Sequence, residues 1–128
     1  MESILVIEDC ALDVVERYGA LVSAFNVDVC LRDAPDQLPT DHNFNLVQPQ
    51  NCFRVDYRAI FIDGLCGLYW KFLRTAGLDD RRDRIYVVSI GPEVIRDAER
   101  RGYNYYWVDI KDSESQSKLK DFLARTLC

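Results

Sequence analysis

Short runs of consecutive apolar residues recur along the chain, and segments with a helical spacing of apolar positions separate them. The runs have strand character and cover residues 3–7, 25–31, 59–62, 85–90 and 103–110. Apolar residues mostly follow one another within these runs, which is typical of strands covered on both faces, as in a parallel sheet. The last run, YNYYWVDI, is dense in aromatic residues, which favour strands.

Four helical patterns alternate with these runs. Residues 11–24 place their apolar side chains on one side of a helix, and further helices are predicted over 67–76 and 92–101. The last helix is expected to begin near Ser113, because Ser113 and Gln116 have the spacing of a capping box. This order of strands and helices predicts an α/β fold.

The expected architecture is a single domain over residues 1–128. It is a flavodoxin-like three-layer sandwich with a five-stranded parallel sheet in the order 2-1-3-4-5. Residues 33–57 contain three prolines and no sustained helical period, so we expect a loop in place of the second helix. Ligands of such sheets bind beyond the carboxyl ends of the strands, between the first and third strands.

Composition narrows the classes of function. A net charge of -5 argues against direct nucleic-acid binding. No apolar stretch approaches the length of a membrane span, and no signal-peptide pattern is present, so we expect a cytoplasmic protein without membrane contacts. The five cysteines form no C-x-x-C pair, which indicates free thiols in a reducing compartment. The single histidine, His42, has no nearby cysteine pair and is interpreted as a loop residue, not a zinc ligand.

Polar side chains follow four of the predicted strands. Glu8 and Asp9 end the first strand and Asp63 ends the third, so in flavodoxin-like order three carboxylates converge. Such a set of oxygen ligands suits Mg²⁺. Ser89 ends the fourth strand and Lys111 follows the fifth, adding a hydroxyl and an ammonium group. Together these groups could stabilise a phosphoryl group on a carboxylate.

With the motifs VIED, FID and VVS, the chain resembles the receiver domains of two-component response regulators. The resemblance implies that Asp63 accepts a phosphoryl group from a histidine kinase or a phosphotransfer protein. It also implies that Glu8, Asp9, Asp63 and the backbone carbonyl of Leu65 hold Mg²⁺. Ser89 would be the hydroxyl that turns toward the phosphoryl group. A receiver is a signalling domain, so we do not expect an enzyme.

The position of the family's lysine stays open. Counting from Ser89 assigns it to Lys111, which we favour, whereas a gapless count from the preceding glycine assigns it to Asp109. The resemblance further implies that an aromatic side chain, Tyr106 or Trp107, repacks when the switch operates. The changed surface would bind a downstream protein, a separate output domain or a second copy in a homodimer.

Two alternatives remain. The loop DGLCG after Asp63 is short and lacks the usual proline, which favours a pseudo-receiver that binds protein partners without phosphorylation. The motif FIDG also resembles phosphatases of the haloacid dehalogenase class, but these need a second aspartate where this chain has Leu65. Cys66 is interpreted as a small buried side chain.

Overall fold

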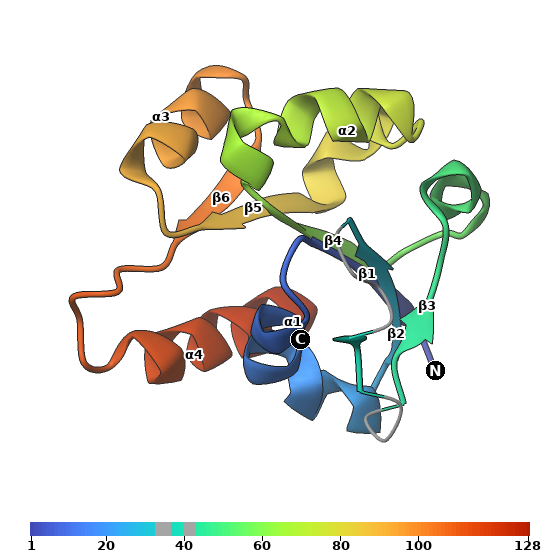
Figure 1. The fold of residues 1–128 in the computed structure, drawn as a ribbon, viewed down its shortest axis with the longest axis horizontal. Helices are drawn as coiled ribbons and strands as arrows, with labels where there is room; N and C mark the ends of the chain where they lie inside the picture. The colour runs from blue at the N-terminus through green and yellow to red at the C-terminus, as the bar shows by residue number, and fades with distance from the viewer. Residues whose placement is uncertain (33–36, 40–42) are drawn as a thin grey trace.

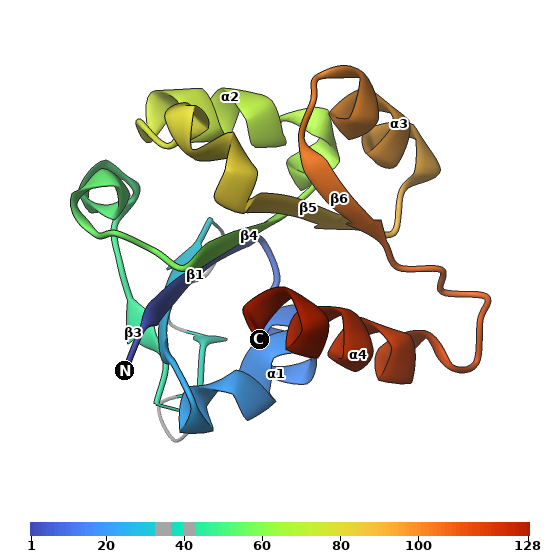
Figure 2. The same ribbon diagram turned by 180° about the vertical axis from the view of Figure 1, so that it is seen from behind.

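A computed structural model describes residues 1–32, 37–39 and 43–128 of the chain. These residues form an α/β structure in which helices flank both faces of one parallel sheet (Figure 1, Figure 2). The predicted α/β class is confirmed, and the architecture is consistent with a flavodoxin-like fold. His42 and part of the predicted 33–57 loop lie outside the described residues.

Within the described residues the sheet contains six strands in the order β3-β2-β1-β4-β5-β6. Their bounds are β1 Ser3–Glu8, β2 Asn26–Leu31, β3 Asn45–Leu46, β4 Ala59–Asp63, β5 Ile85–Ser89 and β6 Asn104–Trp107. The prediction of five strands was wrong because β3, a two-residue strand inside the expected loop, pairs in parallel with β2. Its two residues are too few to produce a hydrophobic pattern. The other strands keep the predicted relative order.

Helices cover the two faces of the sheet in pairs. The α-helices are α1 Ala11–Tyr18, α2 Tyr69–Thr75, α3 Pro92–Arg100 and α4 Ser115–Leu127. The short 3₁₀ helices are η1 Gly19–Ser23, η4 Pro49–Arg54, η5 Leu65–Gly67 and η6 Asp79–Arg84. Helices α2 and α3 lie on one face and α1 and α4 on the other (Figure 1, Figure 2). Among the described residues between β2 and β4 there is no α-helix, and η4 takes that place.

The central strand β1 contributes to a hydrophobic core on each side of the sheet. Leu5 and Ile7 belong to the core that α2 helps to cover, whereas Ile4 and Val6 belong to the core under α1 and α4. All four side chains are fully buried. Burial of each such side chain contributes roughly 1.5–3 kcal/mol, which explains the unbroken apolar run in the sequence.

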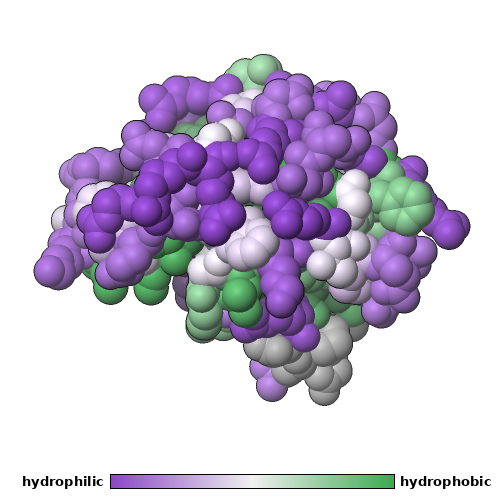
Figure 3. Space-filling model, turned by 90° about the horizontal axis from the view of Figure 1, so that it is seen from above, coloured by the Kyte–Doolittle hydropathy of each residue, from purple (hydrophilic) through white to green (hydrophobic). Residues whose placement is uncertain are grey.

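The outer surface over α2 and α3 carries mostly hydrophilic side chains, with hydrophobic ones in small separate groups (Figure 3). In the described parts of the chain, every helix is too short or too polar to cross a membrane.

Candidate functional site

Three carboxylates meet where the central strands β1 and β4 end. Ile7 pairs with Ile62 in the parallel register, so Glu8 and Asp63 follow side by side. One oxygen from each of Glu8, Asp9 and Asp63 lies within 4.8 Å of the others. The structure therefore brings together the three acids that the sequence placed at neighbouring strand ends.

The three acids differ in their access to water. Glu8 is 1% exposed, whereas the side chains of Asp63 and Asp9 are 19% and 30% exposed. Burial, reinforced by the Asp63 carboxylate, raises the pKa of Glu8 from 4.5 to about 9. Burial also raises the pKa of Asp63. Without a bound cation, Glu8 therefore holds a proton at neutral pH, and a divalent ion would have to displace it.

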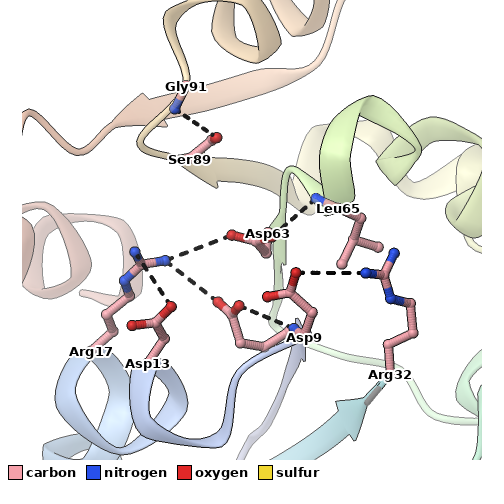
Figure 4. A network of polar contacts seen from close by, with 9 residues as sticks. Asp9, Asp13, Arg17, Arg32, Asp63, Leu65, Ser89 and Gly91 are labelled. Atoms are coloured by element: carbon pink, nitrogen blue, oxygen red, sulfur yellow. Dashed lines mark hydrogen bonds and ion pairs between the residues drawn. The ribbon is translucent and has the colours of Figure 1, made fainter.

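Arg17 of α1 supplies a cation inside this cluster. Its Nη1 atom lies 3.4 Å from Glu8 Oε2 and 3.9 Å from Asp63 Oδ1, and its Nη2 atom lies 4.0 Å from Asp13 Oδ2 (Figure 4). The side chain is only 9% exposed. The sequence analysis did not single out Arg17 and missed this role. The available signal was its spacing, because α1 begins directly after the acid pair and its second turn returns over the strand end.

A second guanidinium group reaches the cluster from β2. Glu8 pairs with Leu31 in the β1–β2 register, so Arg32 comes next to Asp9. Arg32 Nη2 lies 3.7 Å from Asp9 Oδ2, and both side chains are about one-third exposed. Asp9 therefore lies between the other two acids and the Arg32 guanidinium. Because that guanidinium is partly solvated, its attraction to Asp9 is weak.

The chain turns sharply after Asp63. The backbone N–H of Leu65 donates a hydrogen bond to Asp63 Oδ2 at 3.0 Å. Leu65, Cys66 and Gly67 all have positive φ angles, of 49°, 55° and 86°. This left-handed turn buries Leu65 and leaves Cys66 exposed, so the interpretation of Cys66 as a buried side chain was wrong. The role of the Leu65 carbonyl as a metal ligand stays a prediction.

Ser89 lies beside the loop that follows Asp63. Its Oγ atom accepts a hydrogen bond from the Gly91 N–H at 3.1 Å, and the residue is 5% exposed. A Cβ atom placed on Gly64 would lie 3.0 Å from Ser89 Oγ and 2.8 Å from Val94 Cγ1. The absence of a side chain at Gly64 therefore lets the hydroxyl approach this loop. In Figure 4 no polar contact joins Ser89 to Asp63.

The structure does not bring Lys111 to the acid cluster. Lys111 is exposed in the turn after β6, and its ammonium group forms no ion pair with any described residue. Its backbone N–H donates to Asp109 Oδ1 at 3.0 Å. Among the described residues, the cations that contact the acids are the two arginines, Arg17 and Arg32.

The two aromatic residues proposed for the switch point in different directions. The Tyr106 ring stacks on Phe122 of α4 with centroids 4.3 Å apart. Trp107 is 48% exposed, and its indole N–H donates to the Ile90 carbonyl at 3.2 Å. Tyr106 is thus coupled to α4, whereas Trp107 contributes to the outer surface.

A comparison of the chain with family models, with curated proteins and with solved structures finds no match in any of the three. The chain is therefore described by its own geometry. It has a parallel α/β sheet with an acidic cluster at the carboxyl ends of β1 and β4.

Proposed function

We propose that the chain is a receiver domain of a two-component phosphorelay that accepts a phosphoryl group on Asp63 with Mg²⁺. One observation carries this proposal, namely the convergence of Glu8, Asp9 and Asp63 oxygens within 4.8 Å at the ends of two central parallel strands. This is the position where open α/β sheets bind their ligands. The donor set, oxygen atoms of three carboxylates, suits a hard divalent ion.

Each residue of the site has a part in the proposed transfer. Glu8, Asp9 and Asp63 would hold Mg²⁺, which neutralises the charge of the transferred group. An Asp63 carboxylate oxygen attacks phosphorus while the bond between phosphorus and the donor's imidazole nitrogen breaks. The side chain of Asp63 is 19% exposed, so a donor protein can reach it. The Leu65 N–H, already 3.0 Å from Asp63 Oδ2, orients the carboxylate.

Arg17 provides the positive charge that the resemblance implied for Lys111. It lies 3.9 Å from Asp63 without any rearrangement, whereas Lys111 is exposed and unpaired among the described residues. In this proposal Arg17 stabilises the phosphorylated carboxylate, because a fixed cation attracts the added negative charge.

Signal output in this proposal passes from Ser89 to the surface of β6 and α4. Ser89 would exchange its hydrogen bond with the Gly91 N–H for one with the phosphoryl group. The stacking of Tyr106 on Phe122 then links β6 to α4, so repacking of Tyr106 alters the α4 surface. A histidine kinase or phosphotransfer protein supplies the phosphoryl group, and a downstream protein reads the change.

The position of Arg17 also favours a second candidate, the pseudo-receiver. A guanidinium group 3.4 Å from Glu8 and 3.9 Å from Asp63 neutralises the cluster without a metal ion. Such a domain would keep its fold and bind its partner in a single state.

Intact-mass spectrometry after incubation with acetyl phosphate, with and without Mg²⁺, tests the proposal. We expect one phosphoryl adduct on the wild-type chain that requires Mg²⁺ and is absent from Asp63→Asn. Asp121→Asn is the matched control, because Asp121 is an exposed acid on α4 away from the strand ends. If wild type gives no adduct and Mg²⁺ leaves its tryptophan fluorescence unchanged, the receiver proposal is wrong and the pseudo-receiver replaces it.

A further inference from the structure

Two buried cysteines from distant parts of the chain meet on one side of the sheet. Cys30 lies on β2 and Cys52 on η4, and they are 2% and 0% exposed. Both side chains belong to the same buried core cluster, and each thiol lies close enough to the other to shift its pKa. The Cys52 Sγ atom also donates to the Gln48 carbonyl at 3.5 Å. The two sulfur atoms are therefore neighbours in the folded chain although 22 positions separate residues 30 and 52.

Hydrogen bonds fix the position of η4, because the chain that flanks it is bonded to β2 and its carboxyl end is bonded to η6. The Val47 N–H donates to the Val29 carbonyl at 2.9 Å, just before η4 begins. Arg81 donates to the carbonyls of Phe53 and Val55, at 2.5 and 2.6 Å, at the other end of η4. The Tyr57 hydroxyl donates a hydrogen bond of 2.7 Å to Oδ2 of Asp28, which lies two residues before Cys30. The thiol pair is thus part of a fixed contact between two segments.

A cavity adjoins the Cys30 side of this pair. A cavity of about 260 Å³ is lined by Cys30 together with Leu46, Gln48, Pro49 and Phe72 among other residues. Its wall includes Cys30 itself and the residue whose carbonyl accepts the Cys52 hydrogen bond. A water-sized molecule needs only roughly 10–15 Å³ of such space, so hydrogen peroxide fits easily.

The two thiols shift each other's pKa values. The hydrogen bond from Cys30 lowers the pKa of Cys52, although burial and the Asp28 carboxylate oppose this effect. Its interaction with Cys52, together with burial, raises the pKa of Cys30. Two adjacent thiols supply one sulfur that can attack an oxidant and a second that can resolve the oxidised intermediate.

We propose that Cys30 and Cys52 form a redox-sensitive dithiol that hydrogen peroxide converts into an intramolecular disulfide. One sulfur attacks a peroxide oxygen, the O–O bond breaks, and a sulfenic acid and one water form. The second sulfur then attacks the sulfenic sulfur, the S–O bond breaks, and a second water leaves. Two thiols and one peroxide therefore give one disulfide and two waters. This site is separate from the proposed phosphoacceptor.

The disulfide would join β2 to η4 covalently. It would close the chain between residues 30 and 52 and restrict the unfolded state. Because Arg32 follows Cys30 by two residues and pairs with Asp9, the cross-linked strand is the one that reaches the acid cluster.

The test uses a variant in which the three exposed cysteines, Cys10, Cys66 and Cys128, are replaced by serine. The folded protein is treated with hydrogen peroxide, quenched, denatured and alkylated with iodoacetamide. We expect an intact mass lower by two hydrogens, no alkylation, and recovery of both alkylated thiols after reduction with dithiothreitol. The oxidised form should also melt at a higher temperature. Adding Cys52→Ala gives the matched control, which should retain one alkylated or sulfenylated thiol and form no intramolecular disulfide.

Peptide mapping of peroxide-treated wild type keeps the test valid even if a variant fails to fold. A linked peptide pair containing Cys30 and Cys52 supports the proposal. Two fully alkylated thiols at these positions, sulfinic acid without a disulfide, or links that involve only the exposed cysteines would overturn it. The pair would then serve only to fill the core.

Discussion

Arg17 and Glu8 lie in contact at the end of the central strand β1, and both side chains are almost entirely removed from water. The Arg17 Nη1 atom lies 3.4 Å from Glu8 Oε2, and the two side chains are 9% and 1% exposed. A pair in such an environment has lost most of its hydration, so removal of either partner leaves the other poorly compensated.

Replacement of Arg17 by methionine is expected to destabilise the metal-free protein. Arg17→Met removes the guanidinium beside Glu8 and Asp63, and we expect the free energy of unfolding to fall by about 1–3 kcal/mol in EDTA. Urea denaturation measures this change. Arg96→Met on the exposed face of α3 is the matched control and should change stability by less than about 0.5 kcal/mol.

Mg²⁺ should restore much of the stability lost in Arg17→Met, because a bound cation replaces the missing charge at the acid cluster. Equal destabilisation with and without Mg²⁺ would contradict a metal site at these three acids.

Stability without metal should fall as pH rises. The pKa of Glu8 is about 9 in the folded chain, above its ordinary 4.5, so the folded state binds this proton more tightly than the unfolded state. The resulting stabilisation is complete below about pH 4.5 and is lost progressively toward pH 9, by at most about 1.4 kcal/mol per pH unit. Urea midpoints in EDTA between pH 5.5 and 7.5 measure the slope.

Glu8→Gln supplies the control for this pH dependence. Glutamine cannot titrate, so the stability of the variant should fall less steeply with pH. The remaining fall should come from the raised pKa of Asp63. If the wild-type and variant slopes are equal, Glu8 does not hold a proton in the folded chain.

A side chain at Gly64 should disturb the neighbours of Asp63. In Gly64→Ala the new methyl group would lie 2.8 Å from Val94 Cγ1 and 3.0 Å from Ser89 Oγ. We expect the free energy of unfolding to fall by about 1–3 kcal/mol, because these neighbours must shift. The double variant Gly64→Ala, Val94→Ala should lose less than the sum of the two single changes. Strict additivity in this double-mutant cycle would show that the crowding is relieved elsewhere.

The left-handed turn after Asp63 should favour glycine at Cys66. Cys66 is exposed and has a φ of 55°, a conformation that costs other residues roughly 1–2 kcal/mol, whereas glycine adds an entropy cost of roughly 0.5–1 kcal/mol. Cys66→Gly should therefore raise the free energy of unfolding by up to about 1 kcal/mol. Cys10→Gly is the control. Because Cys10 has a φ of −124°, glycine at this position should not raise the free energy of unfolding. Equal effects at both positions would show that the turn at Cys66 is unstrained.

The sequence alone predicted the centre of the fold and the convergence of the acids. Continuous apolar runs such as Ile4–Ile7 appear only where a strand is covered on both sides, and parallel strands end at the same edge of a sheet. Those two regularities are sufficient to place Glu8, Asp9 and Asp63 together.

The cations and the edge of the sheet could not be predicted in the same way. The spacing of Arg17 from the acid pair brings it near the strand end, but whether its guanidinium faces the acids depends on the rotation of α1. Whether Lys111 reaches Asp63 depends on the path of the chain after β6. Strand β3 depends on its pairing with β2, a contact between segments and not a property of its own two residues.

The central position of β1 has a consequence for how the chain folds during synthesis. β1 is synthesised before β4, one of its two partners, which begins only at Ala59. Until β4 has left the ribosome, one edge of β1 stays unpaired and its apolar residues lack half of their covering core. Such long-range pairing slows folding and leaves an unpaired, apolar strand that is prone to aggregation. Nascent chains that stop before β4 should therefore depend most on chaperones that bind extended apolar segments.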